Sequence, residues 1–356
     1  MKKTLSLLLI LLLALTSVFA QPVNETTEKE TIKFTDSAGR IVEIPATIDK
    51  VAPSGAVATM FLAAFAPERM CTVSRRPSTT QMKYLPSELA VLPETGQMYG
   101  SKATLNLEEL LSSGAEIVID LGDYKNGIAE DLDALQSQIG IPVIFIESDL
   151  ENMASAFRTL GRILSMEERG EALGAFVDET MAMAKENREK IIDDEVVSVM
   201  YTTGLDGLGT NARGSSQAQV LEIVGAENAI VVEKLSNKGG GNHINLETAM
   251  AADPDVIVFT DDSIATEVST LSGWKEMSAI KNGKYCVVPS SPYNWLGNPP
   301  SMNMIIGVWW LGNLLYPEYY SYSMVERIRE IYSLLWNYDM TQEEAETMLS
   351  IAKFKN

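Results

Sequence analysis

Two matching stretches decide the fold: residues 105–119, LNLEELLSSGAEIVI, and residues 244–258, INLETAMAADPDVIV. Their spacing is constant, because Asn106 precedes Asn245 by 139 residues and Glu116 precedes Asp255 by the same 139. Each stretch predicts an Asn N-cap, a short helix with an exposed Glu, and a buried strand. Two ordinary helix–strand units can also resemble each other by chance. The identical Asn-Leu-Glu, at equal distance from an acidic residue and a strand, favours two related lobes.

Short apolar runs alternate with helical patterns along the rest of the chain. Because most of these runs are apolar on successive residues, they predict strands buried on both faces of a parallel sheet. An alternating segment at residues 32–44, with a turn at 36–39, predicts a β-hairpin. The expected fold is therefore α/β, with two Rossmann-like lobes built on parallel sheets. The predicted strands are residues 50–53, 70–73, 117–121, 143–146, 196–201, 256–259 and 285–288.

A long helical stretch, residues 149–192, joins the two sets of strands. It lacks Pro, and apolar residues recur at helical spacing, as at Met153, Phe157 and Leu160. About 40 residues predict a rigid connecting helix of roughly 60 Å. Because ligands bind at the carboxyl ends of parallel strands, two facing lobes predict one cleft between them. The expected parts are the N-terminal lobe at 32–148, the connecting helix at 149–192, the C-terminal lobe at 193–320 and C-terminal helices at 321–356.

The N-terminus predicts export from the cytoplasm. Lys2 and Lys3 precede an apolar stretch that ends in small residues up to Ala20, the pattern of a signal peptide over residues 1–20. An uncleaved anchor is the alternative, although the apolar stretch is short for a membrane span. Residues 21–31 are polar and acidic and predict a flexible leader, and no Cys stands at the cleavage point to carry a lipid. We expect a soluble, monomeric, periplasmic protein.

The net charge limits the possible partners, and the positions of the cysteines bear on disulfide formation. The net charge is −20 and becomes −22 without the two lysines of the signal peptide. A field of this sign repels nucleic acid and anionic membranes, so neither is an expected partner. The two cysteines, Cys71 and Cys286, lie in apolar runs in different halves of the chain, so both are expected to be buried and unpaired.

With these motifs in place, the sequence resembles the solute-binding proteins of ABC importers that have a rigid helical backbone and carry siderophores, haem, cobalamin or metal species. The resemblance covers nearly the whole chain after the signal peptide. The last motifs resemble the subgroup that binds iron complexes. The segments that carry it are 35–40 (TDSAGR), 42–45 (VEIP), 106–108 (NLE), 221–229 (LEIVGAENA), Trp274, Ala279, 281–284 (KNGK), Val287, Pro289, 291–295 (SPYNW), 299–301 (PPS) and 314–317 (LLYP).

The resemblance implies a partner, an ABC permease dimer with its ATPase subunits. Members of the family dock on the permease through one acidic residue on each lobe. Glu108 and Glu247 occupy the matching Asn-Leu-Glu positions here, and Glu109 adjoins the first of them. Symmetric carboxylates on twin lobes suit a two-fold permease. The alternative is that both are ordinary first-turn glutamates favoured by the helix dipole.

Candidate ligand-binding residues of the N-terminal lobe follow predicted strands. Ser54 stands at a helix start, where its hydroxyl and nearby backbone N–H groups suit an anion, although it is equally suited to be an N-cap. Arg75 and Arg76 follow the predicted strand 70–73 and suit a carboxylate, catecholate or oxyanion, or else surface ion pairs. Tyr99 and Tyr124, in later loops, offer hydroxyl or stacking contacts.

The C-terminal lobe contributes a second group of candidates. Arg213 and Ser215 follow the strand predicted at 196–201 and precede a helix, an arrangement that again suits an anion. Tyr293, Asn294 and Trp295 follow the strand predicted at 285–288 and suit a planar or bulky chelate. Local packing beside the flanking prolines is the alternative for these three residues.

His243 is the only histidine, and its Gly-rich loop predicts a position at the rim of the cleft. One imidazole can complete the coordination of a metal that arrives already chelated, but it cannot form a multi-His site. The Ser-His-acid, P-loop and dinucleotide-binding patterns of enzymes are missing from the sequence, so we expect no enzyme. An adhesion or signalling module with the same fold is a further alternative.

The predicted function is thus capture of a small metal complex and its delivery to the permease, with no cofactor of the protein's own. A ferric siderophore is the leading cargo because of the resemblance of residues 291–295. Haem, cobalamin, a nickel or cobalt chelate, and molybdate or tungstate stay open.

Overall fold

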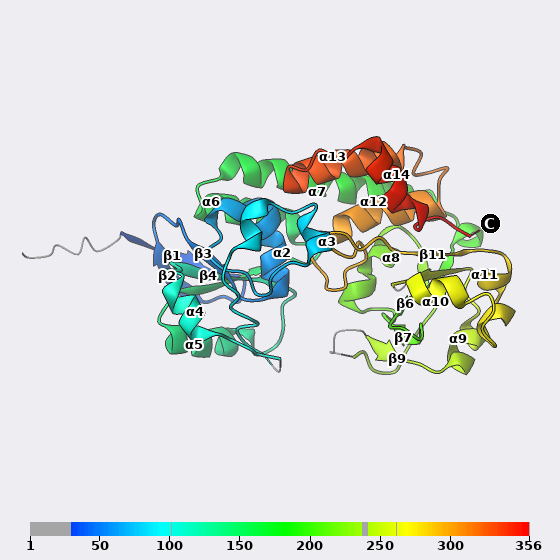
Figure 1. The fold of residues 1–356 in the computed structure, drawn as a ribbon, viewed down its shortest axis with the longest axis horizontal. Coiled ribbons are helices and arrows are strands. Elements are labelled where there is room, and N and C mark those ends of the chain that lie inside the picture. The colour runs from blue at the N-terminus through cyan, green and yellow to red at the C-terminus, as the bar shows by residue number, and fades with distance from the viewer. Residues whose placement is uncertain (1–29, 101, 237–240, 261, 356) are drawn as a thin grey trace, which may run out of the picture.

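The computed structural model describes residues 30–355 except 101, 237–240 and 261. The predicted signal peptide and nearly all of the predicted leader lie outside the described residues. Two α/β lobes lie at opposite ends of the molecule, and helices along one side bridge them (Figure 1). The α/β class with two lobes, predicted above, is confirmed.

A hairpin and a parallel sheet form the N-terminal lobe. The hairpin joins β1 (Thr31–Thr35) to β2 (Ile41–Pro45), and Asp36 caps its turn by accepting hydrogen bonds from the N–H groups of Ala38 and Arg40. The sheet has the order β3-β4-β5, with all three strands parallel. Its elements are β3 (Val51–Pro53), α2 (Ala56–Phe65), α3 (Thr79–Met82), α4 (Leu107–Ser112), β4 (Ile117–Gly122), α5 (Ile128–Ile139) and β5 (Val143–Glu147).

The C-terminal lobe repeats this parallel arrangement and adds an antiparallel edge. Strands β6, β10 and β11 are parallel neighbours in the order β6-β10-β11, and the short β8 also pairs parallel with β6. β7 and β9 extend the sheet antiparallel beyond β6. The sheet is therefore mixed, not purely parallel as predicted. Its elements are β6 (Ser198–Thr203), β7 (Gly209–Thr210), α8 (Gln219–Ile223), β8 (Glu227–Asn228), β9 (Asn242–His243), α9 (Leu246–Ala252), β10 (Val256–Phe259), α10 (Asp262–Glu267), α11 (Ser278–Lys281) and β11 (Tyr285–Val287).

The duplicated helix–strand unit is present in both lobes. The side chain of Asn106 accepts the N–H of Glu109 at the start of α4, and that of Asn245 accepts the N–H of Thr248 at the start of α9. The strand that follows each helix, β4 or β10, is flanked by two parallel partners in its sheet. The 139-residue repeat thus corresponds to the same structural position in each lobe.

The connecting segment differs from the prediction of one long helix. It forms α6 (Met153–Ile163) and α7 (Glu167–Arg188), separated by a turn at Ser165, whose φ is 53°. The two helices pack antiparallel, since a Cβ on Gly170 would meet the Phe157 carbonyl oxygen at 2.8 Å and one on Gly174 would meet that of Ala154 at 3.1 Å. Glycine permits this close approach. Of these two helices, α7, about 33 Å long, is the one that bridges the lobes (Figure 1).

C-terminal helices complete the bridge on the same side as α7 (Figure 1). They are α12 (Met304–Leu315), α13 (Met324–Trp336) and α14 (Gln342–Ser350). α12 is nearly all apolar and buried, and Trp309 Nε1 donates a hydrogen bond of 2.9 Å to Thr180 Oγ1 of α7. One continuous core runs from the N-terminal lobe through these helices into the C-terminal lobe, so the lobes share a rigid support.

Two smaller predictions change. Residues 70–73 form only isolated bridges, from Met70 to Val51 and from Val73 to Glu94, and not a strand. Cys71 and Cys286 are unpaired as expected, but only Cys286 is fully buried. Among the described residues, none of the helices is both long and apolar enough to span a bilayer.

Candidate functional site

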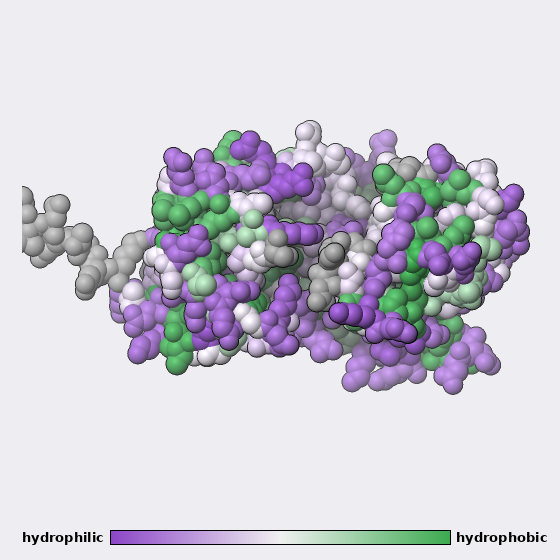
Figure 2. Space-filling model, turned by 90° about the horizontal axis from the view of Figure 1, so that it is seen from below, coloured by the Kyte–Doolittle hydropathy of each residue, from purple (hydrophilic) through white to green (hydrophobic). Residues whose placement is uncertain are grey.

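The candidate ligand site is the space between the lobes at the carboxyl ends of their strands. The crossover segment, residues 288–303, leaves the carboxyl end of β11 and reaches the N-terminal lobe. There Gln81 Nε2 donates a hydrogen bond of 3.0 Å to the Pro292 carbonyl oxygen, and Ser301 Oγ lies 3.1 Å from Met60 Sδ of α2. Figure 2, seen from the side away from the bridging helices, shows the surface hollowed between the two lobes.

A buried carboxyl group organises the N-terminal side of this site. Asp120 lies on β4 and is 5% exposed. Its Oδ1 accepts a hydrogen bond from the hydroxyl of Ser54, which directly follows β3, and its Oδ2 accepts one of 2.6 Å from the hydroxyl of Tyr99. Burial away from water raises the pKa of Asp120, and the two hydroxyl donors act in the opposite direction. The same burial, next to Asp120, raises the pKa of Tyr99.

Asp120 was not among the predicted site residues. The sequence does show an acidic residue within an otherwise apolar strand, which could have marked Asp120. The residues next to it in the chain do not indicate that Ser54 and Tyr99 pair with it. The anion site predicted at the Ser54 hydroxyl is corrected by this arrangement. That hydroxyl is buried and donates its proton to a carboxylate, so it has no proton to offer an anion.

Arg75, Arg76 and Tyr124 lie at the surface of the N-terminal lobe. Both arginines are exposed, and their guanidinium groups have no ion-pair partner in the part of the chain that the structure describes. Tyr124 is half exposed, with its ring centroid 6.5 Å from that of Phe145. These three side chains are therefore available to a ligand.

In the C-terminal lobe, Arg213 is already engaged. Its Nη2 forms an ion pair with Glu227 and donates a hydrogen bond of 2.9 Å to the Asn228 carbonyl oxygen. The Oγ of Ser215 is buried and has no hydrogen-bond partner among the described residues. A buried hydroxyl without a partner is costly, which keeps Ser215 a candidate for a contact that the free chain does not supply.

His243 lies on the short edge strand β9 and faces an acidic partner. Its Nε2 is 3.1 Å from Asp206 Oδ2, and both side chains are well exposed. Hydrogen bonds from the Leu208 N–H and from His243 lower the pKa of Asp206. Within the described ranges there is no group of three or more His, Cys, Asp or Glu side chains that could hold a metal ion. The one imidazole could thus add only a single ligand to a metal.

The predicted aromatic contact at residues 293–295 is largely structural. Asn294 Oδ1 accepts hydrogen bonds from the Tyr201 hydroxyl at 3.2 Å and the Leu296 N–H at 2.9 Å, so it shapes the crossover segment. Trp295 is fully buried, with its ring 6.1 Å from that of Trp310. The ring of Trp295 lies in the core and has no exposed surface to offer a ligand, which agrees with the alternative of local packing. Tyr293 is also buried, at 6% exposure.

The two predicted docking glutamates lie on matching surfaces. Glu108 is exposed on α4 and Glu247 is exposed on α9. Figure 1 places the two helices in different lobes, on the side away from α7 and α12. Both helices thus lie on the side of the molecule that faces away from the bridging helices.

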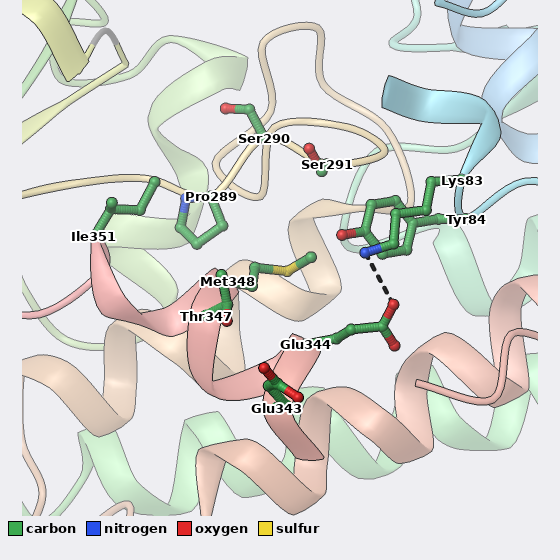
Figure 3. A pocket seen from close by; sticks show the side chains of 10 residues that line it. All are labelled: Lys83, Tyr84, Pro289, Ser290, Ser291, Glu343, Glu344, Thr347, Met348 and Ile351. Carbon is green, nitrogen blue, oxygen red and sulfur yellow. Dashed lines mark ion pairs between the residues drawn. The ribbon is translucent and has the colours of Figure 1, made fainter. Parts of the chain in front are cut away.

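A pocket of about 310 Å³ lies elsewhere, at the junction of the crossover segment, α14 and residues 83–84 (Figure 3). Lys83 Nζ forms an ion pair of 2.9 Å with Glu344 Oε1 at its edge. The ion pair, with hydrogen bonds from Thr341 and Tyr338, lowers the pKa of Glu344 to about 2. This pocket lies between residues 83–84 of the N-terminal lobe and α14, beside the segment that leaves the carboxyl end of β11.

A family model and a known protein that are similar to this chain are both described as binding proteins. The family described as "Periplasmic binding protein" matches residues 73–292. An uncharacterized ABC transporter substrate-binding lipoprotein of Bacillus subtilis is 23% identical over 247 residues, 67% of this chain and 72% of that protein.

Solved structures show the same fold. An ABC transporter solute-binding protein from Sulfurospirillum deleyianum has a TM-score of 0.81 at 24% identity, covering 89% of this chain and 98% of that one. The molybdate-binding protein MolA of Haemophilus influenzae has a TM-score of 0.69 at 17% identity, covering 87% and 99%.

Proposed function

The chain belongs to the periplasmic binding protein family, as a solute-binding protein of an ABC transporter, and on that premise we propose that it captures a metal complex between its lobes and docks on the permease dimer through Glu108 and Glu247. Proteins of this family bind small molecules, are not enzymes and act with permease and ATPase partners. The observation that carries the docking proposal is the duplicated unit, which presents one exposed glutamate at the same position of each lobe.

Charge reversal tests this proposal. The double variant Glu108→Lys, Glu247→Lys should abolish cargo uptake and leave cargo affinity unchanged, because both side chains lie on the outer surfaces of α4 and α9. The matched control is Glu43→Lys, Glu267→Lys, which reverses one exposed glutamate in each lobe away from these helices. Normal uptake by the Glu108/Glu247 variant, or loss of its cargo affinity, would contradict the docking role.

For the cargo we propose an anionic metal chelate, with a ferric siderophore first among the compounds to test. Arg75 and Arg76 support this choice, since two exposed cations without ion-pair partners among the described residues suit carboxylate or catecholate oxygens. Tyr124, half exposed just after β4, adds aromatic surface on the same lobe. Haem, cobalamin, nickel or cobalt chelates and tungstate are alternatives, as is molybdate, which the structurally similar MolA binds.

A thermal-shift screen of residues 21–356 decides among these cargoes. A cargo present at about 1,000 times its dissociation constant stabilises the fold by roughly 4 kcal/mol, which raises the midpoint by several degrees in a chain of this size. Arg75→Gln, Arg76→Gln should remove most of the shift for an anionic chelate. If no compound of the panel shifts the midpoint, the cargo lies outside the metal and chelate class.

We also propose that export removes residues 1–20 and leaves no lipid at the new N-terminus. The related Bacillus subtilis protein is described as a lipoprotein, whereas Gln21 stands here after the predicted cleavage point. The intact mass of the exported protein tests this: a chain that begins at Gln21 without added mass is expected, and an acyl adduct would overturn it.

A further inference from the structure

One apolar side chain accompanies each of the two docking glutamates. Leu111 on α4 is 53% exposed, and Met250 on α9 is 38% exposed. Leu111 is three residues after Glu108, and Met250 is three residues after Glu247. Residues three apart on a helix are surface neighbours, so each carboxylate lies beside an exposed apolar group.

The two helices also match in which residues they bury. In the repeat, Leu110 corresponds to Ala249, and both are fully buried. The preceding Leu107 and Leu246 are both half-buried. Each helix thus has an ordinary anchor in its lobe. Leu111 lies outside that packing, and Met250 stays 38% exposed although its Sδ lies near Gly273. Single exposed apolar residues are common on proteins. An exposed apolar residue at the same place in both copies of a duplicated unit is not explained in that way.

We propose that Glu108 with Leu111, and Glu247 with Met250, are two matching halves of one docking surface, and that each half contacts one subunit of the permease dimer through a basic side chain beside an apolar socket. This inference rests on the docking role proposed above and adds the apolar contact to it. The occupant follows from the duplication, because two equivalent surfaces on one chain require a partner with two equivalent sites. The carboxylates meet a basic partner by charge complementarity.

The acidic and apolar parts have different physical effects. Exposed charges mainly speed association and weaken with salt, whereas a buried apolar contact slows dissociation and is little affected by salt. Leu111 and Met250 therefore set how long the docked complex lasts, and Glu108 and Glu247 set how fast it forms.

The test compares three double variants for binding to the cognate permease–ATPase complex in proteoliposomes, at low and high salt. Leu111→Ser, Met250→Ser should weaken binding about ten-fold or more at both salt concentrations, with faster dissociation. Glu108→Gln, Glu247→Gln should slow association and reduce the salt dependence. The matched control is Val91→Ser, Val231→Ser, which removes one exposed apolar side chain per lobe outside α4 and α9 and should bind as the unmodified protein does. Unchanged thermal midpoints show that the variants fold.

The outcomes separate this inference from the docking role itself. If the glutamate variant binds poorly and the Leu111/Met250 variant binds within two-fold of the unmodified protein, the apolar contact is refuted and the docking role stands. If the Val91/Val231 control loses as much affinity as the Leu111/Met250 variant, the effect is not specific to α4 and α9 and the inference also fails. If neither glutamates nor apolar residues matter, both proposals fail.

Discussion

The N-terminal and C-terminal lobes share one framework, and the repeat brings out a difference at one equivalent position in their sheets. The 139-residue repeat aligns Asp120 of β4 with Phe259 of β10. Asp120 accepts hydrogen bonds from Ser54 and Tyr99, whereas Phe259 is fully buried against Trp274 and Tyr285. The same strand position is thus polar in one lobe and apolar in the other. The framework tolerates either, provided that the surrounding loops supply matching partners.

The largest effect is expected from Phe259→Asp, which tests whether the C-terminal lobe accepts a carboxylate at the position equivalent to Asp120. The carboxylate would lie where the ring now contacts Trp274 at 5.7 Å and Tyr285 at 6.2 Å between ring centroids, with no hydroxyl donors such as those of the other lobe. Loss of a buried Phe alone costs about 3–5 kcal/mol, and an unpaired polar group adds to that cost. Urea denaturation should show a largely unfolded C-terminal lobe. Phe259→Leu is the control and should stay folded; a stable Asp variant would refute the comparison.

The converse substitution, Asp120→Asn, should have a smaller and pH-dependent effect. Because burial raises the pKa of Asp120 above its unfolded value, the folded state binds its proton more tightly. Stability from this group is therefore full below the unfolded pKa of about 4 and falls as pH rises toward the folded pKa. The Asn variant lacks this dependence, so its stability relative to the unmodified protein should increase from about pH 4 upward. Urea midpoints of both proteins, measured across pH, give this difference in stability. A relative stability of the Asn variant that decreases as pH rises would contradict the expectation.

The two N-caps allow the stability of the repeated helices to be compared, with a smaller expected effect. Asn106→Ala and Asn245→Ala each remove a side-chain acceptor from the first turn of a short helix, and each should cost about 1 kcal/mol of unfolding free energy. Replacement by Asp keeps the acceptor and serves as the control. Equal losses are expected if the repeat is equivalent in energy as well as in position. A loss confined to one lobe would show that only one cap stabilises its helix.

The smallest expected effect concerns the contact between the N-terminal lobe and α14. Glu344→Gln removes the ion pair with Lys83, whose side chain is 47% exposed, and a partly exposed pair of this kind should contribute only about 0.5 kcal/mol. Because the folded-state pKa of Glu344 is lowered to about 2, this contribution is present above its unfolded pKa and is lost as pH falls through about 2. Thermal midpoints of the two proteins should therefore differ slightly at pH 7 and converge near pH 2. A difference that persists there would assign the effect to packing.

Local signals predicted much of the fold. The hairpin at residues 32–44, the two Asn caps and six of the seven other predicted strands agree with the structure, because turn residues, caps and apolar runs act over a few neighbouring residues. The long connecting helix was mispredicted, since its apolar spacing continues across the turn at Ser165. Periodicity cannot distinguish one helix from two that pack together.

The candidate site was less predictable because its contacts join distant parts of the chain. The anion site at Ser54 failed because its hydroxyl pairs with Asp120, 66 residues away. Arg213 was a candidate ligand contact but pairs with Glu227, 14 residues on. The ring of Trp295 packs beside that of Trp310 in the core, although its motif suggested a position at the ligand cleft.

The sequence by itself determined that this protein has two related α/β lobes, which family it resembles and where its twin acidic helices stand, since each follows from a local pattern or its repetition. The tertiary structure alone decided which polar groups are free to meet a ligand and which are used up within the fold. The physical reason is that a hydrogen bond or an ion pair depends on distance in space, and the chain brings Asp120, Ser54 and Tyr99 together only when the sheet and its loops have formed.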